Sequence, residues 1–154
     1  MTAPETPTPG VRPVPRGRAG WRAQAPVVAV VALGGALGAV GRYALTLAWP
    51  TPPGGFPWAT FWTNVSGCAA MGALMVLVTE VWAAAPHLLR PFLATGVLGG
   101  FTTFSTYAVD VRGLLDTGRP GPGLACLAAT PCAALAAVWL ASAAARRVFT
   151  GRRR

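Results

Sequence analysis

Charged residues are scarce in this sequence, and lysine is absent. Only 11% of the 154 residues are charged, all 13 basic residues are arginine, and four residues are acidic. A soluble domain normally carries about twice that fraction of charge. Because 53% of the residues are hydrophobic and the mean hydropathy is +0.50, the sequence predicts a small integral membrane protein.

Residues that commonly bind metals or act in catalysis are also few. The three cysteines lie in apolar stretches without CxxC spacing, which argues against a zinc site or a disulfide framework. The single histidine, His87, lies in a short predicted loop beside Pro86. The sequence shows no nucleophile–base pair, which argues against an enzyme. It also shows no nucleotide-binding motif or mid-membrane carboxylate that would support active pumping.

The net charge of +9 reflects membrane topology rather than a surface for nucleic acid. Four arginines precede the first apolar segment and five follow the last one, and no basic helical face carries interleaved aromatic residues. Arginines that flank membrane spans mark the cytoplasmic side. The sequence therefore predicts a multi-pass plasma-membrane protein with cytoplasmic N- and C-termini, whose surroundings are the lipid bilayer and which binds no nucleic acid.

Four stretches approach the roughly 20 apolar residues that cross a bilayer. They form one all-α transmembrane domain over residues 25–146, between a disordered basic tail at 1–24 and a second basic tail at 147–154. A bundle this small encloses little volume, so a pore would require a second subunit. We place the four spans at about residues 26–49, 58–84, 91–115 and 124–145.

The third stretch reads GVLGGFTTFSTYAVD at Gly96–Asp110, unlike an ordinary spanning helix. Gly99 and Gly100 weaken a helix, because each glycine costs about 1 kcal/mol relative to alanine. A break in hydrocarbon survives only beside protein or a water-filled cavity. The pattern predicts a third helix interrupted at mid-membrane, with the break as the functional site. Gly34 and Gly38 in the first span form a GxxxG pair, which favours close helix contact.

Polar residues in the other spans leave alternatives open. Arg42 is either an anchor that reaches the membrane interface or the partner of a carboxylate such as Asp110. Asn64 either joins two helices or offers its two amide donors to an anion. Pro131 should kink the fourth span and free a carbonyl one turn back. The neighbouring Thr130 either lines a polar track or bonds its own backbone.

Three patches together resemble the Fluc/CrcB family of fluoride channels. They read GGALGAVGRY at Gly34–Tyr43, FPWATFWTNVSG at Phe56–Gly67 and GVLGGFTTFSTY at Gly96–Tyr107. The third patch is the most specific, and the resemblance extends from about residue 25 to residue 146. It implies an antiparallel, dual-topology dimer of oppositely oriented subunits, with two narrow fluoride pathways and a structural sodium ion at the dimer centre.

Residue roles also follow from the resemblance. The backbone carbonyls of Gly99 and Thr102 would hold the sodium ion, and Arg42 and Asp110 would support the site. Fluoride would move past groups that present partial positive charge, namely an amide, hydroxyls and aromatic ring edges, which replace its lost water. By motif position these groups belong to Asn64, Phe104, Ser105, Thr106 and Tyr107.

Two features depart from the family pattern. Tyr107 stands at the second phenylalanine position, where its hydroxyl adds a polar group. Ten arginines lie on the predicted cytoplasmic side, whereas at most Arg112 and Arg119 lie on the other, which predicts one fixed orientation. We therefore hypothesise a heterodimer with an inverted homologous subunit, with a homodimer as the alternative.

The resemblance implies passive export of cytoplasmic fluoride, which lowers fluoride toxicity. An inside-negative potential favours exit of the anion by about 2.3 kcal/mol per 100 mV. One rival, a small four-helix dimeric drug/proton antiporter, needs a titrating carboxylate deep in a span, and the first span offers only Arg42. A second rival, a non-transporting membrane scaffold, explains the GxxxG face but gives the hydroxyl-rich break no role.

Overall fold

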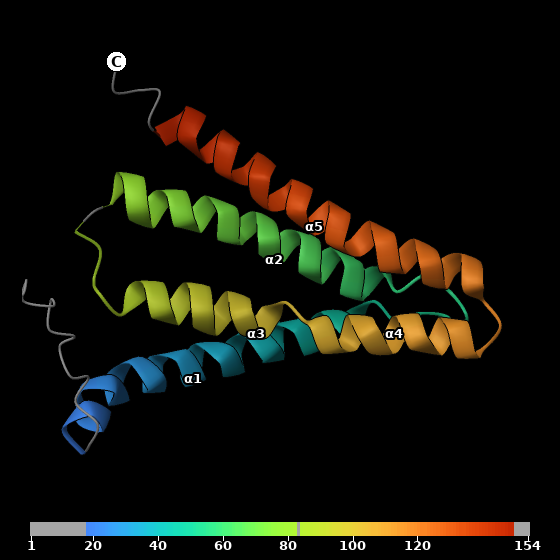
Figure 1. The fold of residues 1–154 in the computed structure, drawn as a ribbon, viewed down its shortest axis with the longest axis horizontal. Helices are drawn as coiled ribbons and strands as arrows, with labels where there is room; N and C mark the ends of the chain where they lie inside the picture. Colours follow the sequence, from blue (N-terminus) through green and yellow to red (C-terminus); the bar gives the residue numbers. More distant parts are fainter. Residues whose placement is uncertain (1–17, 83, 150–154) are drawn as a thin grey trace, which may run out of the picture.

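The chain contains four membrane-length helical segments in the computed structural model, which describes residues 18–82 and 84–149 (Figure 1). Within these residues every regular element is helical, which confirms the predicted all-α membrane fold. The second segment ends in a short π-helical stretch, η1 (Leu77–Val81). The three uninterrupted α-helices are α1 (Arg18–Ala48), α2 (Trp58–Val76) and α5 (Pro120–Phe149).

The third segment is broken, as the sequence predicts. Thr102 and Thr103 have extended backbone, with ψ of 153° at Thr102 and 126° at Thr103, and so interrupt the helix. The break lies just after the glycine pair, because Gly99 and Gly100 themselves remain helical. The parts of this segment are η2 (Pro91–Leu98, π-helical), α3 (Gly99–Phe101) and α4 (Phe104–Asp116).

Close packing against α1 explains why the glycines lie before the break and not in it. A Cβ atom on Gly38 would collide with the Val97 carbonyl oxygen, and one on Gly100 would collide with the Gly35 carbonyl oxygen. Bare backbone on both helices permits this approach. The predicted GxxxG face of the first span therefore packs against η2 and α3.

Several element boundaries differ from the predicted ones. Helix α1 begins at Arg18, so residues 18–24, which we assigned to the disordered tail, are helical. Helix α5 already begins at Pro120, because proline is tolerated in a first helical turn, and it continues to Phe149. The remaining parts of the two predicted tails, residues 1–17 and 150–154, lie outside the described residues.

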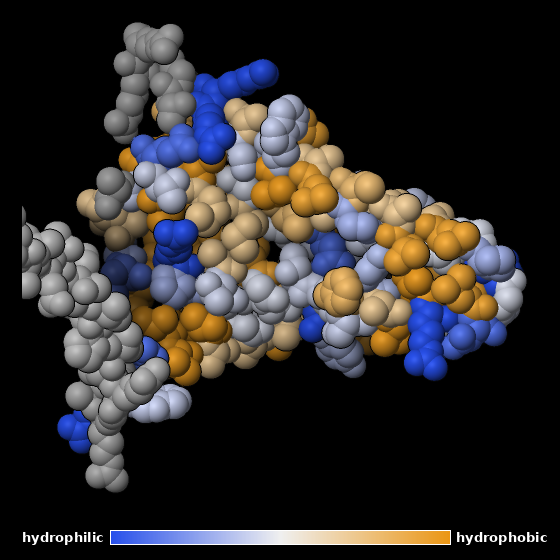
Figure 2. All heavy atoms as spheres, viewed as in Figure 1, coloured by the Kyte–Doolittle hydropathy of each residue, from blue (hydrophilic) through white to orange (hydrophobic). Residues whose placement is uncertain are grey.

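The helices are arranged so that the break lies within the bundle. Helix α2 runs beside α5, α1 runs beside η2 and α3, and α4 packs on α5 (Figure 1). The start of α1 and the end of α5 lie at the same end of the molecule. Hydrophilic residues gather mostly toward the two ends, and large apolar side chains cover much of the surface between them (Figure 2).

Candidate functional site

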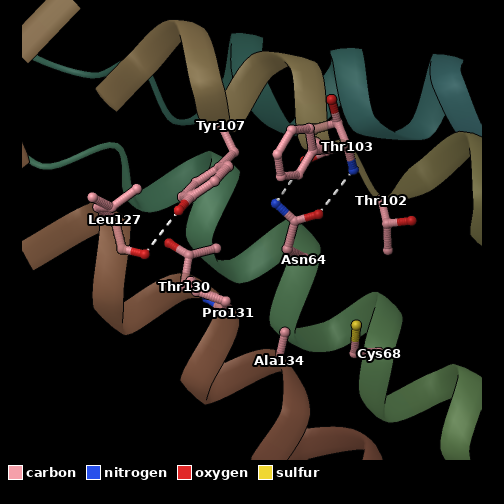
Figure 3. Close-up of a pocket in the computed structure, with 10 residues that line it drawn as sticks. Asn64, Cys68, Thr102, Thr103, Tyr107, Leu127, Thr130, Pro131 and Ala134 are labelled. Atoms are coloured by element: carbon pink, nitrogen blue, oxygen red, sulfur yellow. Dashed lines mark hydrogen bonds between the residues drawn. The ribbon is translucent and has the colours of Figure 1, made fainter. Parts of the chain in front are cut away.

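A pocket of about 530 Å³ lies beside the break, between α2, α4 and α5 (Figure 3). Three of the five residues predicted to form an ion pathway line it: Asn64, Phe104 and Tyr107. Ser105 and Thr106 are not among its lining residues. The rest of the wall comes from the break itself and from facing positions on α2 and α5, namely Cys68, Thr102, Thr103, Leu127, Thr130, Pro131 and Ala134.

Asn64 holds the broken backbone with both atoms of its amide group. Its Oδ1 accepts a hydrogen bond from the Thr103 N–H at 2.8 Å, and its Nδ2 donates to the Thr103 carbonyl at 3.1 Å (Figure 3). The same Nδ2 donates to the Thr60 carbonyl at 3.1 Å. Both amide donors therefore bind carbonyl oxygens, so in this structure Asn64 joins α2 to the break, the first of the two sequence alternatives.

Thr103 begins α4 and organises the hydroxyl groups of the break. Its Oγ1 accepts from the Thr106 N–H at 3.1 Å, which is an N-cap, and donates to the Thr106 Oγ1 at 3.0 Å. The Ser105 Oγ lies 3.3 Å from the Thr103 Oγ1. Thr103 is not among the sequence-predicted site residues, although a threonine directly before the first apolar residue of a helix is a capping signal.

The break leaves main-chain carbonyls without their helical donors. The Leu98 carbonyl still accepts from the Thr102 N–H at 3.0 Å and from the Thr102 Oγ1 at 2.9 Å. The Gly100 carbonyl accepts from the Arg42 Nε at 3.4 Å. Among the described residues, no donor is found for the carbonyls of Gly99 and Thr102.

These two carbonyls fit the sodium ion that the resemblance implies. Hard cations take oxygen ligands, and main-chain carbonyls left unpaired at a helix break are such ligands. Over residues 18–82 and 84–149 there is no group of three or more His, Cys, Asp or Glu side chains that could hold a metal. A cation between these two carbonyls would be held by neutral main-chain oxygens.

Arg42 and Asp110 have separate partners. The Asp110 Oδ2 accepts a hydrogen bond from the Thr60 Oγ1 at 2.6 Å, whereas Arg42 reaches the Gly100 carbonyl. In the part of the chain that the structure describes, the two side chains form no ion pair. Thr60 was not identified from sequence. Its spacing of four residues from Asn64 places both on one face of α2 and could have revealed it.

The two aromatic residues of the predicted pathway differ sharply in exposure. Phe104 is 80% exposed and Tyr107 is 8% exposed, with ring centroids 5.7 Å apart. The Tyr107 hydroxyl donates to the Leu127 carbonyl on α5 at 2.8 Å. Phe104 thus presents its ring at the surface of the molecule, whereas Tyr107 is part of the packed wall between α4 and α5.

Comparisons with known proteins identify the family. Residues 29–142 match the family described as CrcB-like protein, Camphor Resistance (CrcB). The chain is 63% identical over 153 residues to "Fluoride-specific ion channel FluC 1" of Streptomyces coelicolor, covering 99% of both chains. It is 62% identical to "Fluoride-specific ion channel FluC 2" of Streptomyces avermitilis, covering 78% of this chain and 75% of the relative. A "Fluoride-specific ion channel FluC 2" from Nocardia farcinica is 55% identical, covering 78% of this chain and 85% of the relative.

Proposed function

Because this chain belongs to the CrcB family, and its relatives are named fluoride-specific ion channels, we infer that it is a fluoride channel. The observation that carries this conclusion is the 63% identity along almost the whole chain. The broken third segment gives the function a physical location, since its polar groups lie beside a pocket in an otherwise apolar bundle. The family is one of channels and not of enzymes.

The direction of transport follows from electrostatics. Fluoride is an anion, and an inside-negative membrane potential favours its exit by about 2.3 kcal/mol per 100 mV. Hydrogen fluoride enters cells as a neutral molecule and dissociates at neutral internal pH, which leaves the anion trapped. A passive pathway therefore exports cytoplasmic fluoride and lowers its toxicity.

The proposed channel is a dimer of oppositely oriented subunits in the plasma membrane. Phe104 lies at the mouth of the pocket with its ring exposed, so one subunit leaves the pathway open on that side. Leu33, Leu37 and Val40 form an exposed apolar face on α1, which lipid or a second subunit must cover. A second subunit over these surfaces would enclose a pathway that one small bundle does not enclose alone.

The arginine distribution supports a partner that is a homologue and not a second copy. Arg146 and Glu80 pair at 2.8 Å near the end of the bundle where α1 starts, and Arg112 and Asp116 pair at 3.3 Å at the opposite end. The ten arginines that the sequence predicts on the terminal side far exceed the acidic residues predicted there. The positive-inside rule then fixes both termini in the cytoplasm. A reporter fused to the C-terminus should appear on that face alone, and equal appearance on both faces would contradict the heterodimer.

We assign the proposed sodium site to the Gly99 and Thr102 carbonyls of each subunit, supported by Arg42 at the neighbouring Gly100 carbonyl. Sodium held there would place a positive charge close to an anion pathway. The chain's own contribution is the break, which Asn64 and Thr103 keep open.

A growth experiment tests the function in cells. Bacteria that lack their own fluoride exporters should survive fluoride when they express this chain together with an inverted homologue of the same family. Expression of the chain alone distinguishes the two dimers, because a homodimer protects cells without the homologue. Failure to protect under both conditions, with the expressed proteins present in the membrane, would contradict the proposed function.

A further inference from the structure

Pro131 leaves one carbonyl of α5 without its helical donor. In a regular helix the Leu127 carbonyl accepts from the N–H of residue 131, four residues later. Pro131 lies inside α5 and has no N–H to donate. Leu127 and Pro131 both line the pocket beside the break, so the freed carbonyl belongs to the pocket wall (Figure 3).

The Tyr107 hydroxyl supplies the missing donor from another helix. It lies 2.8 Å from the Leu127 carbonyl oxygen, and its side chain crosses from α4 to α5 (Figure 3). The side chain is buried, and one of its ends is fixed by α4 and the other by this hydrogen bond. The hydroxyl that distinguishes Tyr107 from a phenylalanine thus has a specific acceptor, the Leu127 carbonyl. This carbonyl lacks its helical donor because residue 131 is proline.

An uncovered carbonyl at this position would oppose an anion. Carbonyl oxygens carry partial negative charge, and in a low-dielectric wall that charge acts more strongly than in water. Fluoride in the pocket would meet this oxygen together with the acceptors already bound by Asn64. A hydroxyl proton placed on the Leu127 oxygen reduces the repulsion and satisfies a polar group that is costly to leave unpaired.

We propose that Tyr107 and Pro131 are a matched pair of positioning residues, in which Pro131 frees the Leu127 carbonyl and the Tyr107 hydroxyl covers it to keep the pocket wall permissive for an anion. This proposal rests on the proposed fluoride-channel function. The proposed pairing predicts that the effect of removing the Tyr107 hydroxyl depends on the residue at position 131. If Tyr107 only packed locally, the effect would be the same with proline or alanine at that position.

The test is a double-mutant cycle on the full chain, reconstituted in liposomes with and without an inverted homologue and measured as fluoride release. The midpoint of thermal unfolding in detergent is the second readout. Tyr107→Phe should reduce the rate of fluoride release about tenfold and lower the unfolding temperature, because the Leu127 carbonyl loses its donor. Pro131→Ala supplies the reference background of the cycle, because the two lone pairs of the Leu127 carbonyl can accept both the restored main-chain N–H and the Tyr107 hydroxyl. The double variant Tyr107→Phe/Pro131→Ala should recover both properties, because the main-chain N–H restored at position 131 takes the place of the hydroxyl.

Tyr43→Phe is the matched control, since it removes the hydroxyl of the other tyrosine, which is exposed on α1. This control should leave fluoride release and unfolding unchanged. The proposal is overturned if Tyr107→Phe conducts as fast as wild type, or if Pro131→Ala fails to restore it. A wild-type protein that releases no fluoride, either alone or with an inverted homologue, gives a different signature: it overturns the channel function, and with it the role of the pair in the pathway.

Discussion

The side chain of Asn64 bonds both main-chain groups of Thr103, accepting from its N–H at 2.8 Å and donating to its carbonyl at 3.1 Å. In an unbroken helix the Thr103 N–H would donate to the Gly99 carbonyl, four residues earlier. By taking this N–H, Asn64 both stabilises the break and leaves the Gly99 carbonyl free for another partner. The amide thus links α2 packing to the proposed cation site.

Replacing Asn64 with leucine should damage both stability and transport. The variant removes both hydrogen bonds from the Asn64 amide to the Thr103 main chain. As long as the break persists, the Thr103 N–H is then unpaired, and a buried unpaired group costs about 1–3 kcal/mol. We expect a clearly lower unfolding temperature and loss of fluoride release from liposomes. Ser66→Ala on the same helix is the control, because the Ser66 hydroxyl bonds the Trp62 carbonyl one turn back, at 2.6 Å, and joins no other helix. Wild-type behaviour of Asn64→Leu would show that the break does not depend on this amide.

The contact between Thr60 and Asp110 predicts a second sensitive position. Thr60→Val keeps the shape of the side chain and removes the 2.6 Å hydrogen bond to the carboxyl group. Hydrogen bonds to charged groups contribute about 1.5–3 kcal/mol, so the unfolding free energy should fall by that order. Thr46→Val removes a hydroxyl that bonds only the Arg42 carbonyl of its own helix, at 3.1 Å, and should have little effect. Equal effects of the two variants would argue against a role for the Asp110 contact.

The close approach of α1 and α3 is testable at neighbouring glycines. Gly100→Ala places a methyl group against the Gly35 carbonyl and should reduce folded protein in the membrane strongly. Gly35→Ala meets no atom within 4 Å. It should be neutral or stabilising, because alanine favours a helix by about 1 kcal/mol over glycine. Size-exclusion profiles and unfolding temperatures of the two variants provide the comparison, and a well-folded Gly100→Ala protein would refute the predicted contact.

Removing sodium should destabilise the protein if Gly99 and Thr102 hold the ion. A ligand that binds only the folded state adds about 2.7 kcal/mol when present at 100 times its dissociation constant. Replacing sodium with a large organic cation should therefore lower the unfolding temperature of wild type. The shift should shrink in Asn64→Leu, where the Gly99 carbonyl can regain its helical donor. An unfolding temperature that is the same with and without sodium would contradict the site.

The sequence alone was sufficient for the four spans and the interruption of the third, because span length and hydroxyl-rich glycine motifs have direct physical consequences. It placed the weak point at Gly99 and Gly100, whereas both are helical, with Gly100 packed against Gly35, and the break follows at Thr102 and Thr103. Such a shift depends on contacts between distant segments, which local propensity does not contain.

The partners of individual side chains were equally hard to predict. Pro131 was expected to free a carbonyl, but only the folded chain shows that Tyr107 reaches it. Arg42 bonds the Gly100 carbonyl, and Asp110 accepts a hydrogen bond from Thr60. The packing of the helices on one another decides these partners. The roles of the pathway and sodium residues stay predictions that the variants above address.

Fluoride release from liposomes, recorded with a fluoride electrode, is the most direct test of the central claim that this chain forms a fluoride-selective pathway at the broken helix. Purified protein is reconstituted with and without an inverted homologue, and the vesicles are loaded with fluoride or chloride. We predict that fluoride leaves rapidly in at least one of these preparations while chloride is retained. Retention of fluoride in both, or release of chloride at the same rate, would contradict the account.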